Sequence, residues 1–474
     1  MRSGTRSAFL AVGVLVGTPR PTHARCSARG GKDAISVEHY DFAGPSVYGY
    51  ETDTVRRVAS ISVHSSPLAT LGGKDAGGMN VYVRELACHT ARLGLPVDVF
   101  SRRTDPDAPE TLAICPGVNL VNIAAGPAAP VDKNRLFDYL PEFAEEMALY
   151  SLRHGTRYDV VHAHYWLSGW VAHLLKRYWE TPFVQMFHTT AHMKNAVSPM
   201  GQRETPLRER IESQLVRLAD SLIAANPDER ADLIWRQRTR AEKICTIPPG
   251  VDVELFTPRD RAICRLTLGI PADEPIVLFV GRVDPIKGID TLLCTALAFD
   301  RFGTKATILF VGGDLDDAGE PVGPLKGVVE EASRLGVASR FRFVGSQPQD
   351  RLPLYYGAAD AVAVPSRYES FGLVAVEAMA CGRPVVASRV GGLTFTVEDG
   401  CTGYLAPVGD FGSFADHLAR ILGDSALRDR LGANAHESAQ RFGWASVAES
   451  VLHVYDRLSS GHRANLCCPQ EIFA

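Results

Sequence analysis

The sequence predicts an α/β protein built from two doubly wound domains that face each other across a central cleft. From Val58 onward, short β-branched runs alternate with amphipathic stretches, a pattern typical of parallel sheets covered by helices on both faces. The alternation pauses once, over residues 247–275, where proline and glycine are frequent and the strand pattern is weak. Glycine-rich turns follow strands on both sides of this pause, and open α/β sheets bind ligands beyond the carboxyl ends of their strands.

Each half of the chain supplies its own series of strands. In the first half we expect strands at residues 58–63, 97–100, 159–164, 182–188 and 221–225. A helix after Gly78 is indicated by Met79, Val83, Leu86 and Leu93 at helical spacing, with Gly94 as its stop signal. In the second half we expect strands at residues 276–281, 306–313, 340–345, 361–366 and 384–388. The chain therefore carries two sheets in sequence.

From these patterns we divide the chain into six segments. They are a leader or disordered tail (1–57), a first domain (58–247), a linker (248–272), a second domain (273–440), a terminal helix (441–460) and a tail (461–474). The terminal helix is indicated by Phe442, Val447, Val451 and Val454. It is either a packing helix of the second domain or, as we interpret it, a helix that crosses back to the first.

Composition excludes some classes of protein. The 474 residues are 46% hydrophobic and 22% charged, as in ordinary soluble proteins. The net charge of −4 lacks the excess of basic residues that is typical of nucleic-acid-binding proteins. The ten cysteines are scattered, and none forms a Cys-x-x-Cys motif. We interpret them as structural or incidental free thiols in a reducing compartment.

Residues 366–386 carry the first chemical motif. A buried strand is followed by a turn, and the turn by a helix that ends at Gly382. Gly372 allows close approach to the helix N-terminus, whose free N–H groups favour phosphate. Glu369 precedes the helix and Glu377 lies inside it, and carboxylates suit the paired hydroxyls of a sugar or a ribose. The alternative for Glu377 is that it reaches solvent on the flank of the helix.

The stretch "GRVDPIKG" at residues 281–288 supplies positive charge that could pair with a bound phosphate. Arg282 directly follows a strand and Lys287 comes five residues later, where an anion bound at the sheet edge would lie. Fixed cationic groups can stabilise a departing nucleoside diphosphate as a metal ion would.

Together these two motifs resemble those of the retaining glycosyltransferases of family 4, which have the GT-B fold of two Rossmann-like domains. The resemblance extends from Val58 to about Leu458. The stretches "SVHSSPL", "DAGGMNVYV" and "VVHAHYWLSG" are most similar to the D-inositol-3-phosphate N-acetylglucosaminyltransferase and sucrose-phosphate synthase group. The resemblance implies transfer of a hexosyl or N-acetylhexosaminyl group from a nucleotide sugar, UDP-linked in this group, to a hydroxyl of a small polar acceptor.

The resemblance also implies roles for individual residues. The catalytic residues would be His188, Arg282, Lys287 and Glu369. The donor site, in the second domain apart from Gly78, would comprise Gly78, Arg282, Lys287, Gln347, Glu369, Phe371, Gly372, Leu373 and Glu377. The acceptor site, in the first domain, would comprise His64, Asn80, Lys133, Tyr165 and Thr189. No metal and no cofactor besides the nucleotide sugar is implied, and the departing phosphate would help to deprotonate the acceptor in a same-face substitution.

Two positions depart from that group. The stretch "LRERIESQL" places Glu209 where an arginine is expected to bind the acceptor phosphate, and one position is 100° around a helix from Arg208 or Arg210. A glutamate there would repel a phosphate. Gln347 stands where a donor-site arginine is expected, so hydrogen bonding is kept but a charge is lost.

Two other functions stay open. A nucleotide-sugar epimerase of the same fold needs no acceptor, and a non-catalytic binding protein needs no turnover. A dehydrogenase is disfavoured because no Gly-x-Gly-x-x-Gly follows a strand. Asp314 and Asp316, and likewise His162 and His164, are residue types that bind metals, but we interpret the first pair as a polar turn and the second as structural.

The amino-terminal 26 residues have a basic start and an apolar run at residues 8–17, like a signal peptide. The run is too short to span a bilayer. Because the implied donor is cytoplasmic, we interpret this leader as non-native or mis-assigned and expect a cytoplasmic protein without stable membrane insertion. The expected partners are the nucleotide sugar and a small-molecule acceptor, with no nucleic acid, and a homodimer stays open.

Overall fold

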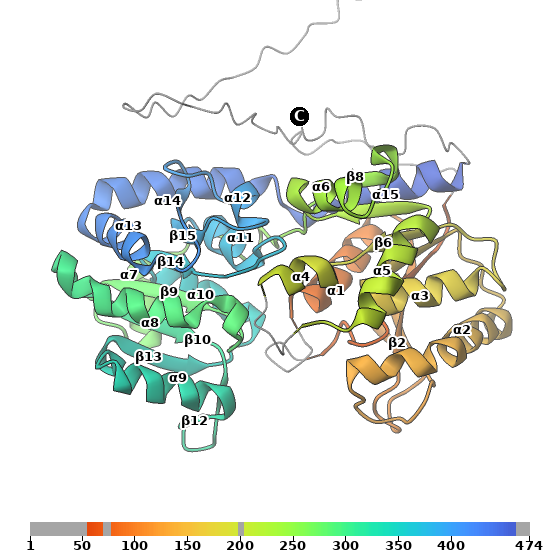
Figure 1. The fold of residues 1–474 in the computed structure, drawn as a ribbon, viewed down its shortest axis with the longest axis horizontal. Helices are drawn as coiled ribbons and strands as arrows, with labels where there is room; N and C mark the ends of the chain where they lie inside the picture. The colour runs from red at the N-terminus through yellow and green to blue at the C-terminus, as the bar shows by residue number, and fades with distance from the viewer. Residues whose placement is uncertain (1–54, 70–76, 198–202, 461–474) are drawn as a thin grey trace, which may run out of the picture. The chain divides into compact units, whose positions relative to one another are not determined.

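The structure is a computed structural model that describes residues 55–69, 77–197 and 203–460 (Figure 1). Nearly all of the predicted leader, and the whole of the predicted tail, lie outside the described residues. Two large sheets follow one another along the chain, the first within residues 58–246 and the second within residues 276–406. The prediction of two parallel sheets is thereby confirmed, whereas the exact domain boundaries stay a prediction.

The first sheet has eight strands in the order β3-β4-β2-β1-β5-β6-β7-β8. The strands are β1 Val58–Ile61, β2 Val97–Arg102, β3 Thr111–Cys115, β4 Val118–Ile123, β5 Val160–His164, β6 Phe183–Met186, β7 Ser221–Ala224 and β8 Ile244–Thr246. All neighbours are parallel except the hairpin of β3 and β4. The chain order reverses between β1 and β5, and ligands bind outside the carboxyl ends of strands at such a switch point.

The second sheet is wholly parallel, in the order β13-β10-β9-β14-β15-β16. Its strands are β9 Ile276–Val280, β10 Thr307–Val311, β13 Phe341–Gly345, β14 Ala361–Val364, β15 Val385–Ser388 and β16 Gly403–Ala406. The switch point lies between β9 and β14. The two motifs singled out in the sequence follow these two strands directly, so both motifs lie at one edge of the sheet.

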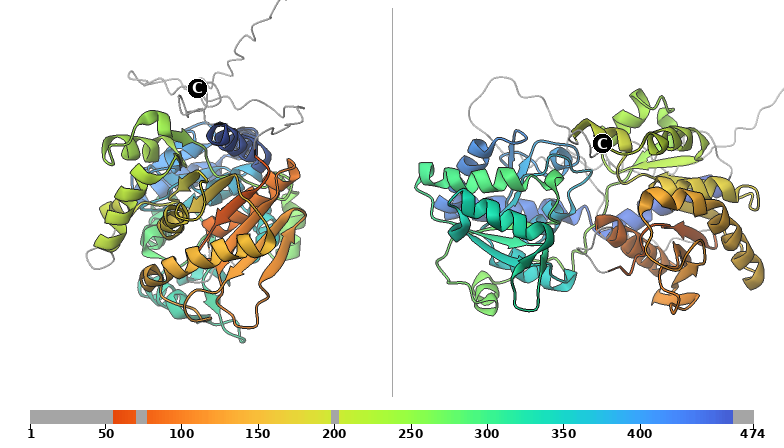
Figure 2. Two further views of the ribbon diagram at one scale, coloured as in Figure 1. Left: turned by 90° about the vertical axis from the view of Figure 1, so that its right-hand side faces the viewer. Right: turned by 60° about the horizontal axis from the view of Figure 1, so that its bottom comes forward.

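Helices cover both faces of each sheet (Figures 1 and 2). Around the first sheet lie α1 Gly78–Arg92, α2 Leu140–His154, α3 Tyr165–Leu175, α4 Ala191–Val197, α5 Pro206–Leu218 and α6 Pro227–Trp235. Around the second lie α7 Arg261–Leu268, α8 Ile289–Ala298, α9 Gly323–Arg334, α10 Leu352–Ala358, α11 Leu373–Ala380, α12 Leu393–Thr396, α13 Phe411–Gly423 and α14 Ser425–Gln440. Burial on both faces explains why the central strands read as continuous apolar runs.

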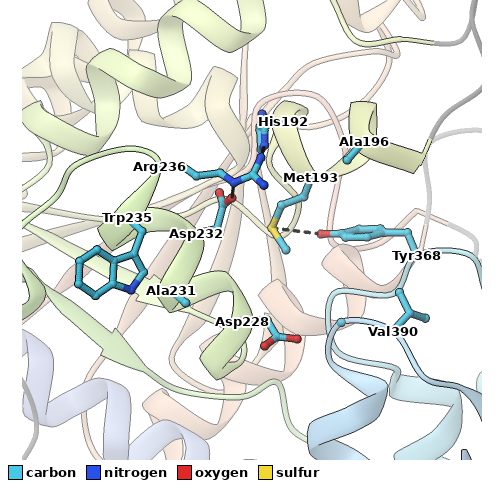
Figure 3. A pocket seen from close by; sticks show the side chains of 11 residues that line it. His192, Met193, Ala196, Asp228, Ala231, Asp232, Trp235, Arg236, Tyr368 and Val390 are labelled. Atoms are coloured by element: carbon cyan, nitrogen blue, oxygen red, sulfur yellow. Dashed lines mark hydrogen bonds and ion pairs between the residues drawn. The ribbon is translucent and has the colours of Figure 1, made fainter.

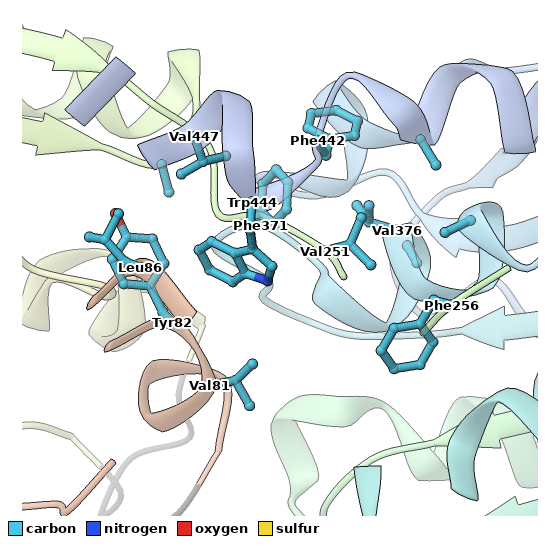
Figure 4. Packing of buried hydrophobic residues seen from close by; sticks show 14 of the residues in the cluster. Val81, Tyr82, Leu86, Val251, Phe256, Phe371, Val376, Phe442, Trp444 and Val447 are labelled. Carbon is cyan, nitrogen blue, oxygen red and sulfur yellow. The ribbon is translucent and has the colours of Figure 1, made fainter. Parts of the chain in front are cut away.

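The last helix, α15 Trp444–Ser459, packs against α1 and β5 of the first sheet although it follows α14 of the second (Figure 1). The Tyr455 hydroxyl lies 2.7 Å from Nδ1 of His162 on β5. Trp444 meets Tyr82 of α1 edge to face, with ring centroids 5.5 Å apart. Figure 4 shows Trp444 among residues of both halves of the chain, including Phe371 of the second. One buried apolar cluster thus links α1, α11 and α15.

Replacing Trp444 by alanine should lower the free energy of unfolding by about 3–5 kcal/mol, the usual cost of removing a large buried aromatic ring. Trp444 is only 2% exposed, so the vacated volume has no access to solvent. Urea denaturation followed by circular dichroism measures the effect. Trp235→Ala is the control, because that ring is 80% exposed and its loss should change stability by about 0.5 kcal/mol or less. Equal effects in both variants would contradict the packing role of Trp444.

The cysteines differ from the sequence-based expectation. Cys88 on α1 and Cys115 at the end of β3 form a disulfide, so the interpretation of all cysteines as free thiols is wrong for this pair. The sequence hides the pairing because the two residues lie 27 positions apart and meet only where α1 covers the β3–β4 hairpin. Among the described residues, the free cysteines are Cys245, Cys264, Cys294, Cys381 and Cys401.

No helix in the described part of the chain is long and apolar enough to cross a membrane.

Candidate functional site

A cavity of about 500 Å³ is lined by segments that follow β1, β5 and β6 of the first sheet and β9 and β14 of the second. All but two of the predicted site residues line it: His64, Gly78, Asn80, Lys133, Tyr165, His188, Thr189, Arg282, Lys287, Glu369, Phe371, Gly372 and Leu373. Gln347 and Glu377 do not. Residues far apart in the sequence therefore meet at the carboxyl ends of two parallel sheets, where ligands bind in this class of fold.

Figure 3 shows the side chains around a second cavity, of about 440 Å³. This cavity shares only Tyr368 with the first. Its walls come from α4, α6 and the loop at Val390. Its one cationic side chain, Arg236, is engaged with His192 and with Asp232, 3.5 Å away. None of the predicted site residues lines this cavity, so we take the 500 Å³ cavity as the candidate site.

The N-termini of α1 and α11 both open on the cavity. Asn80 fixes the first of them: its Oδ1 accepts from the Gly77 N–H at 2.9 Å, and its Nδ2 donates to Ser65 and Ser66 at 2.6 Å each. A Cβ at Gly78 would stand 3.0 Å from the Leu373 side chain at the start of α11. Glycine at position 78 therefore lets the two helix ends approach, and free N–H groups at helix starts favour anions.

The loops after β9 and β14 interlock through their backbones. The Arg367 N–H donates to the Ile286 carbonyl at 2.7 Å. Gly288 has a φ of +66°, and a Cβ there would stand 1.9 Å from the Pro365 carbonyl oxygen. The close approach explains the last glycine of "GRVDPIKG" and fixes Lys287 against the second loop.

Lys287 and Glu369 form an ion pair inside the cavity. The Lys287 Nζ donates to Glu369 Oε2 at 2.7 Å, and both side chains are largely buried, at 22% and 17% exposed. Glu369 is held further by its own backbone, since its carbonyl accepts from the Gly392 N–H at 2.9 Å. Arg282 is more exposed and lies 3.7 Å from Asp284. A cation and a carboxylate acceptor of hydrogen bonds thus stand side by side next to the N-terminus of α11.

The two donor-site residues outside the cavity have internal partners. Glu377 Oε2 accepts from the Tyr356 hydroxyl at 2.7 Å. Burial raises the pKa of Glu377 to about 7, and the hydrogen bond from Tyr356 opposes that rise only in part. The alternative that Glu377 reaches solvent is wrong, because it is only 9% exposed. Gln347 Nε2 donates to the Val344 carbonyl of its own loop at 3.2 Å.

Two histidines, His64 and His188, line the cavity on the first-sheet side. His164 Nδ1 lies 3.1 Å from His188 Nε2, and the rings of His162 and His164 lie 4.2 Å apart. Burial lowers the pKa of His188 to about 3, with His162 and His64 adding to the effect. The pKa of His64 is likewise lowered to about 3, first by burial and then by Lys133 and Arg208. These rings are therefore neutral near pH 7 and can orient a ligand through hydrogen bonds.

The structure corrects the assignment of Glu209 to the acceptor end. Glu209 is exposed and accepts a hydrogen bond from Asn195, whereas Arg208 is 2% exposed and lines the cavity. Arg208 donates to the Tyr165 hydroxyl at 2.8 Å, to the Thr189 carbonyl at 2.5 Å and to Glu212 at 2.6 Å. The rotation of about 100° between neighbouring residues of α5 directs Arg208 into the cavity and Glu209 to solvent. The expected repulsion of a phosphate by Glu209 therefore falls away.

The sequence reasoning also missed Lys194, Glu204 and Tyr368, which line the cavity. Lys194 Nζ donates to Glu204 Oε1 at 2.6 Å, and Lys133 Nζ lies 4.0 Å from the same oxygen. Arg208 and Glu212 are spaced by four residues and share one face of α5, but Glu204 precedes that helix, so helical spacing alone does not place it in the cavity. Three cationic side chains thus gather at the first-sheet end of the cavity.

The residue pairs considered as metal ligands have other partners. Asp316 Oδ1 accepts from the Ala318 and Glu320 N–H groups at 2.9 Å each, as expected for a polar turn. His162 contacts Tyr455, and His164 contacts His188. Within the described ranges, no group of three or more histidine, cysteine or acidic side chains is arranged to hold a metal ion.

Comparison with known proteins gives concordant results in both halves of the chain. The model of the glycosyl transferases group 1 matches residues 261–438, and the model of glycosyltransferase family 4 matches residues 76–255. The D-inositol 3-phosphate glycosyltransferase of Kribbella flavida is 42% identical over 407 residues, which cover 85% of this chain and 95% of that protein. The protein of the same name from Mycolicibacterium smegmatis is 42% identical over 417 residues, 87% of this chain and 94% of that one.

A solved structure is similar over the same range. The sucrose-phosphate synthase from Thermosynechococcus elongatus superimposes with a TM-score of 0.78 at 37% sequence identity. The superposition covers 86% of this chain and 100% of that one.

Proposed function

Because this chain belongs to the family 4 glycosyltransferases of GT-B fold, we propose that it moves a hexosyl or N-acetylhexosaminyl group from a UDP-linked donor to a hydroxyl of a phosphorylated polyol, with retention. D-inositol 3-phosphate is the first acceptor to test, because relatives 42% identical to this chain are named for it. The observation that carries the proposal is one cavity with the Lys287–Glu369 pair at one end and Lys133, Lys194 and Arg208 at the other.

Each end of the cavity suits one substrate. At the second-sheet end, the N-terminus of α11 and the cations Arg282 and Lys287 favour the diphosphate of a nucleotide sugar. Glu369 offers its free oxygen to sugar hydroxyls while Lys287 holds the other. At the first-sheet end, Lys133, Lys194 and Arg208 favour the phosphate group of an acceptor.

In the proposed mechanism the acceptor hydroxyl attacks the anomeric carbon from the face that the diphosphate leaves, and the departing phosphate takes its proton. Lys287, Arg282 and the N–H groups of α11 stabilise the negative charge that builds on the leaving group. His188 and Glu369 hold the sugar in position. With its lowered pKa of about 3, His188 stays neutral and acts as a hydrogen-bonding group.

The rival functions leave part of the cavity without a use. An epimerase that acts on the nucleotide sugar alone has no need of the cations at the first-sheet end. A binding protein without turnover has no need of Lys287 paired with Glu369 beside the anion site.

Donor affinity should depend on the protonation of Glu377. Although Glu377 does not line the cavity, we propose that the donor's ribose reaches its carboxyl. Because burial raises its pKa to about 7, this carboxyl is largely protonated at pH 6 and ionised at pH 8, and the ionised form is the better acceptor for ribose hydroxyls. We expect KM for the donor to fall several-fold from pH 6 to pH 8. Glu377→Gln should remove most of this change. Steady-state kinetics at fixed saturating acceptor measures it, and an identical pH profile in both proteins would contradict the role of Glu377.

Product analysis tests the function itself. The full chain is incubated with EDTA, a UDP-, GDP- or ADP-sugar, and D-inositol 3-phosphate, fructose 6-phosphate or unphosphorylated inositol, and products are identified by mass. We expect a new phosphorylated glycoside with the UDP-sugar, despite the chelator. An altered nucleotide sugar without a glycoside would favour the epimerase. Transfer to unphosphorylated inositol alone would overturn the proposed acceptor class.

We also place the activity in the cytoplasm, where nucleotide sugars are made. The disulfide between Cys88 and Cys115 is the observation that tells against this location, because such bonds are rare in cytosolic proteins.

A further inference from the structure

Three cations of the acceptor end converge on one carboxylate, that of Glu204. Lys194 Nζ lies 2.6 Å and Lys133 Nζ 4.0 Å from its Oε1, and an Arg208 terminal nitrogen lies 3.1 Å from its Oε2. The Glu204 side chain is only 6% exposed and lines the cavity. Burial alone would raise the pKa of Glu204, but Arg208, the hydrogen bond from Lys194 and the charge of Lys133 lower it to about 2. The carboxylate therefore stays ionised at any working pH.

The two carboxylates that contact Arg208 differ in how firmly they are held. Glu212 accepts from Arg208 Nε at 2.6 Å and from the Ala191 N–H at 2.7 Å, and it is 2% exposed on α5. Glu204 precedes the first turn of α5, and its carboxylate accepts a hydrogen bond from Lys194 at 2.6 Å, but its contact with Arg208 at 3.1 Å is an ion pair without a described hydrogen bond. Glu212 is thus a fixed structural partner, and Glu204 is the one that can yield Arg208 to another anion.

We propose that Glu204 is an internal competitor for the acceptor's phosphate: its carboxylate occupies the cationic subsite in the free protein, and a phosphorylated acceptor must displace it. The inference rests on the proposed function, because it requires an acceptor that carries a phosphate. A phosphate monoester bears a charge of about −1.5 to −2, so it draws the same three cations but is repelled by Glu204.

This competition determines specificity. A bare anion gains only the contacts with the cations and loses to Glu204, whereas an acceptor that also makes hydroxyl contacts in the cavity binds in spite of it. Glu204 thereby disfavours inorganic phosphate, which is abundant in cells, relative to a phosphorylated polyol. Removing its charge should strengthen both ligands, and inorganic phosphate by the larger factor.

Binding of inorganic phosphate and of D-inositol 3-phosphate to the full chain tests this, by calorimetry on the wild type, Glu204→Gln and Glu209→Gln. Glu209→Gln is the matched control, since it removes the same charge five residues on, from an exposed side chain. We expect Glu204→Gln to bind inorganic phosphate at least about tenfold tighter than the wild type, in keeping with the cost of a like charge beside an anion. Glu209→Gln should bind it as the wild type does. In turnover assays, inorganic phosphate should inhibit Glu204→Gln at correspondingly lower concentration.

If Glu204→Gln binds inorganic phosphate more weakly than the wild type, or equally well, the inference is overturned. Glu204 would then be a structural residue that orients the cations. If D-inositol 3-phosphate binds the wild type but the variants do not differ, the inference fails while the proposed acceptor stands. If no phosphate compound binds any of the three proteins, the proposed acceptor fails and the inference with it. Should Glu204→Gln not fold, Glu204→Asp withdraws the carboxylate by one methylene, and a twofold to threefold gain in phosphate affinity is then expected.

Discussion

Lys287→Ala should lower kcat by about 100-fold or more, the usual effect of removing one preorganised group that stabilises developing charge. The Lys287 Nζ contacts Glu369 at 2.7 Å beside the N-terminus of α11, where we place the leaving diphosphate. Charge on that group is larger in the transition state than in the bound donor, so the loss should appear in kcat more than in the acceptor KM. Steady-state kinetics with both substrates varied gives the two parameters separately.

A second variant in the site and a control variant outside it accompany Lys287→Ala. Glu369→Ala should also reduce turnover at least tenfold, because the sugar loses the carboxylate that orients it. Lys305→Ala should leave kcat unchanged, since Lys305 is an exposed lysine of the second half that is not part of the cavity. Circular dichroism and thermal unfolding must show that each variant is folded. Wild-type turnover in folded Lys287→Ala or Glu369→Ala would defeat the assignment of the site.

Local pattern was sufficient to predict most of the fold. Central strands such as β9 and β14 are buried on both faces, so their apolar runs are readable without any tertiary knowledge. The hairpin of β3 and β4 was not predicted, because β3 is a short edge strand of exposed or half-buried residues that pairs antiparallel, outside the alternation of parallel strands and helices. The disulfide between Cys115 and Cys88 depends on the position of α1 against this hairpin, and the spacing of the cysteines in the sequence does not reveal that position.

Some of the site residues could likewise be predicted from the sequence, and others could not. Residues directly after strands, such as Arg282 and Glu369, line the cavity because the fold class itself fixes where strand ends lie. Residues on helices are harder to place. An error of one position on α5 exchanges the buried Arg208 for the exposed Glu209, a rotation of about 100°.

The contacts between side chains far apart in the sequence could not be predicted from the sequence pattern. His162 and His164 alternate on β5, which predicts a shared face, but their partners are Tyr455 on α15 and His188 after β6. Likewise, the pattern placed Glu377 inside a helix, but it could not show that Tyr356 of α10 meets its carboxylate. Such partners decide the charge and orientation of a group, and only the three-dimensional structure provides them.

Removal of the Arg208 charge should raise KM for a phosphorylated acceptor by about 100-fold or more, because charge-assisted bonds of a desolvated arginine are among the strongest in a binding site. Arg208→Ala alone is a poor test. It would leave Glu212, only 2% exposed, as an unpaired buried charge, which typically destabilises a protein by about 3–5 kcal/mol. The double variant Arg208→Gln/Glu212→Gln removes both charges together and keeps two groups that can hydrogen-bond each other.

In the double variant, KM for the nucleotide sugar should stay near the wild-type value, because its proposed site is at the other end of the cavity. Any slow transfer to unphosphorylated inositol should also persist, since that acceptor has no charge for Arg208 to bind. Arg210→Ala is the control, as Arg210 lies two residues away on the exposed side of α5. An unchanged acceptor KM in the double variant, with the fold retained, would mean that the acceptor's charged group lies elsewhere. The similarity to glycosyltransferases that act on phosphorylated inositol would then extend to the fold and the donor end but not to the acceptor.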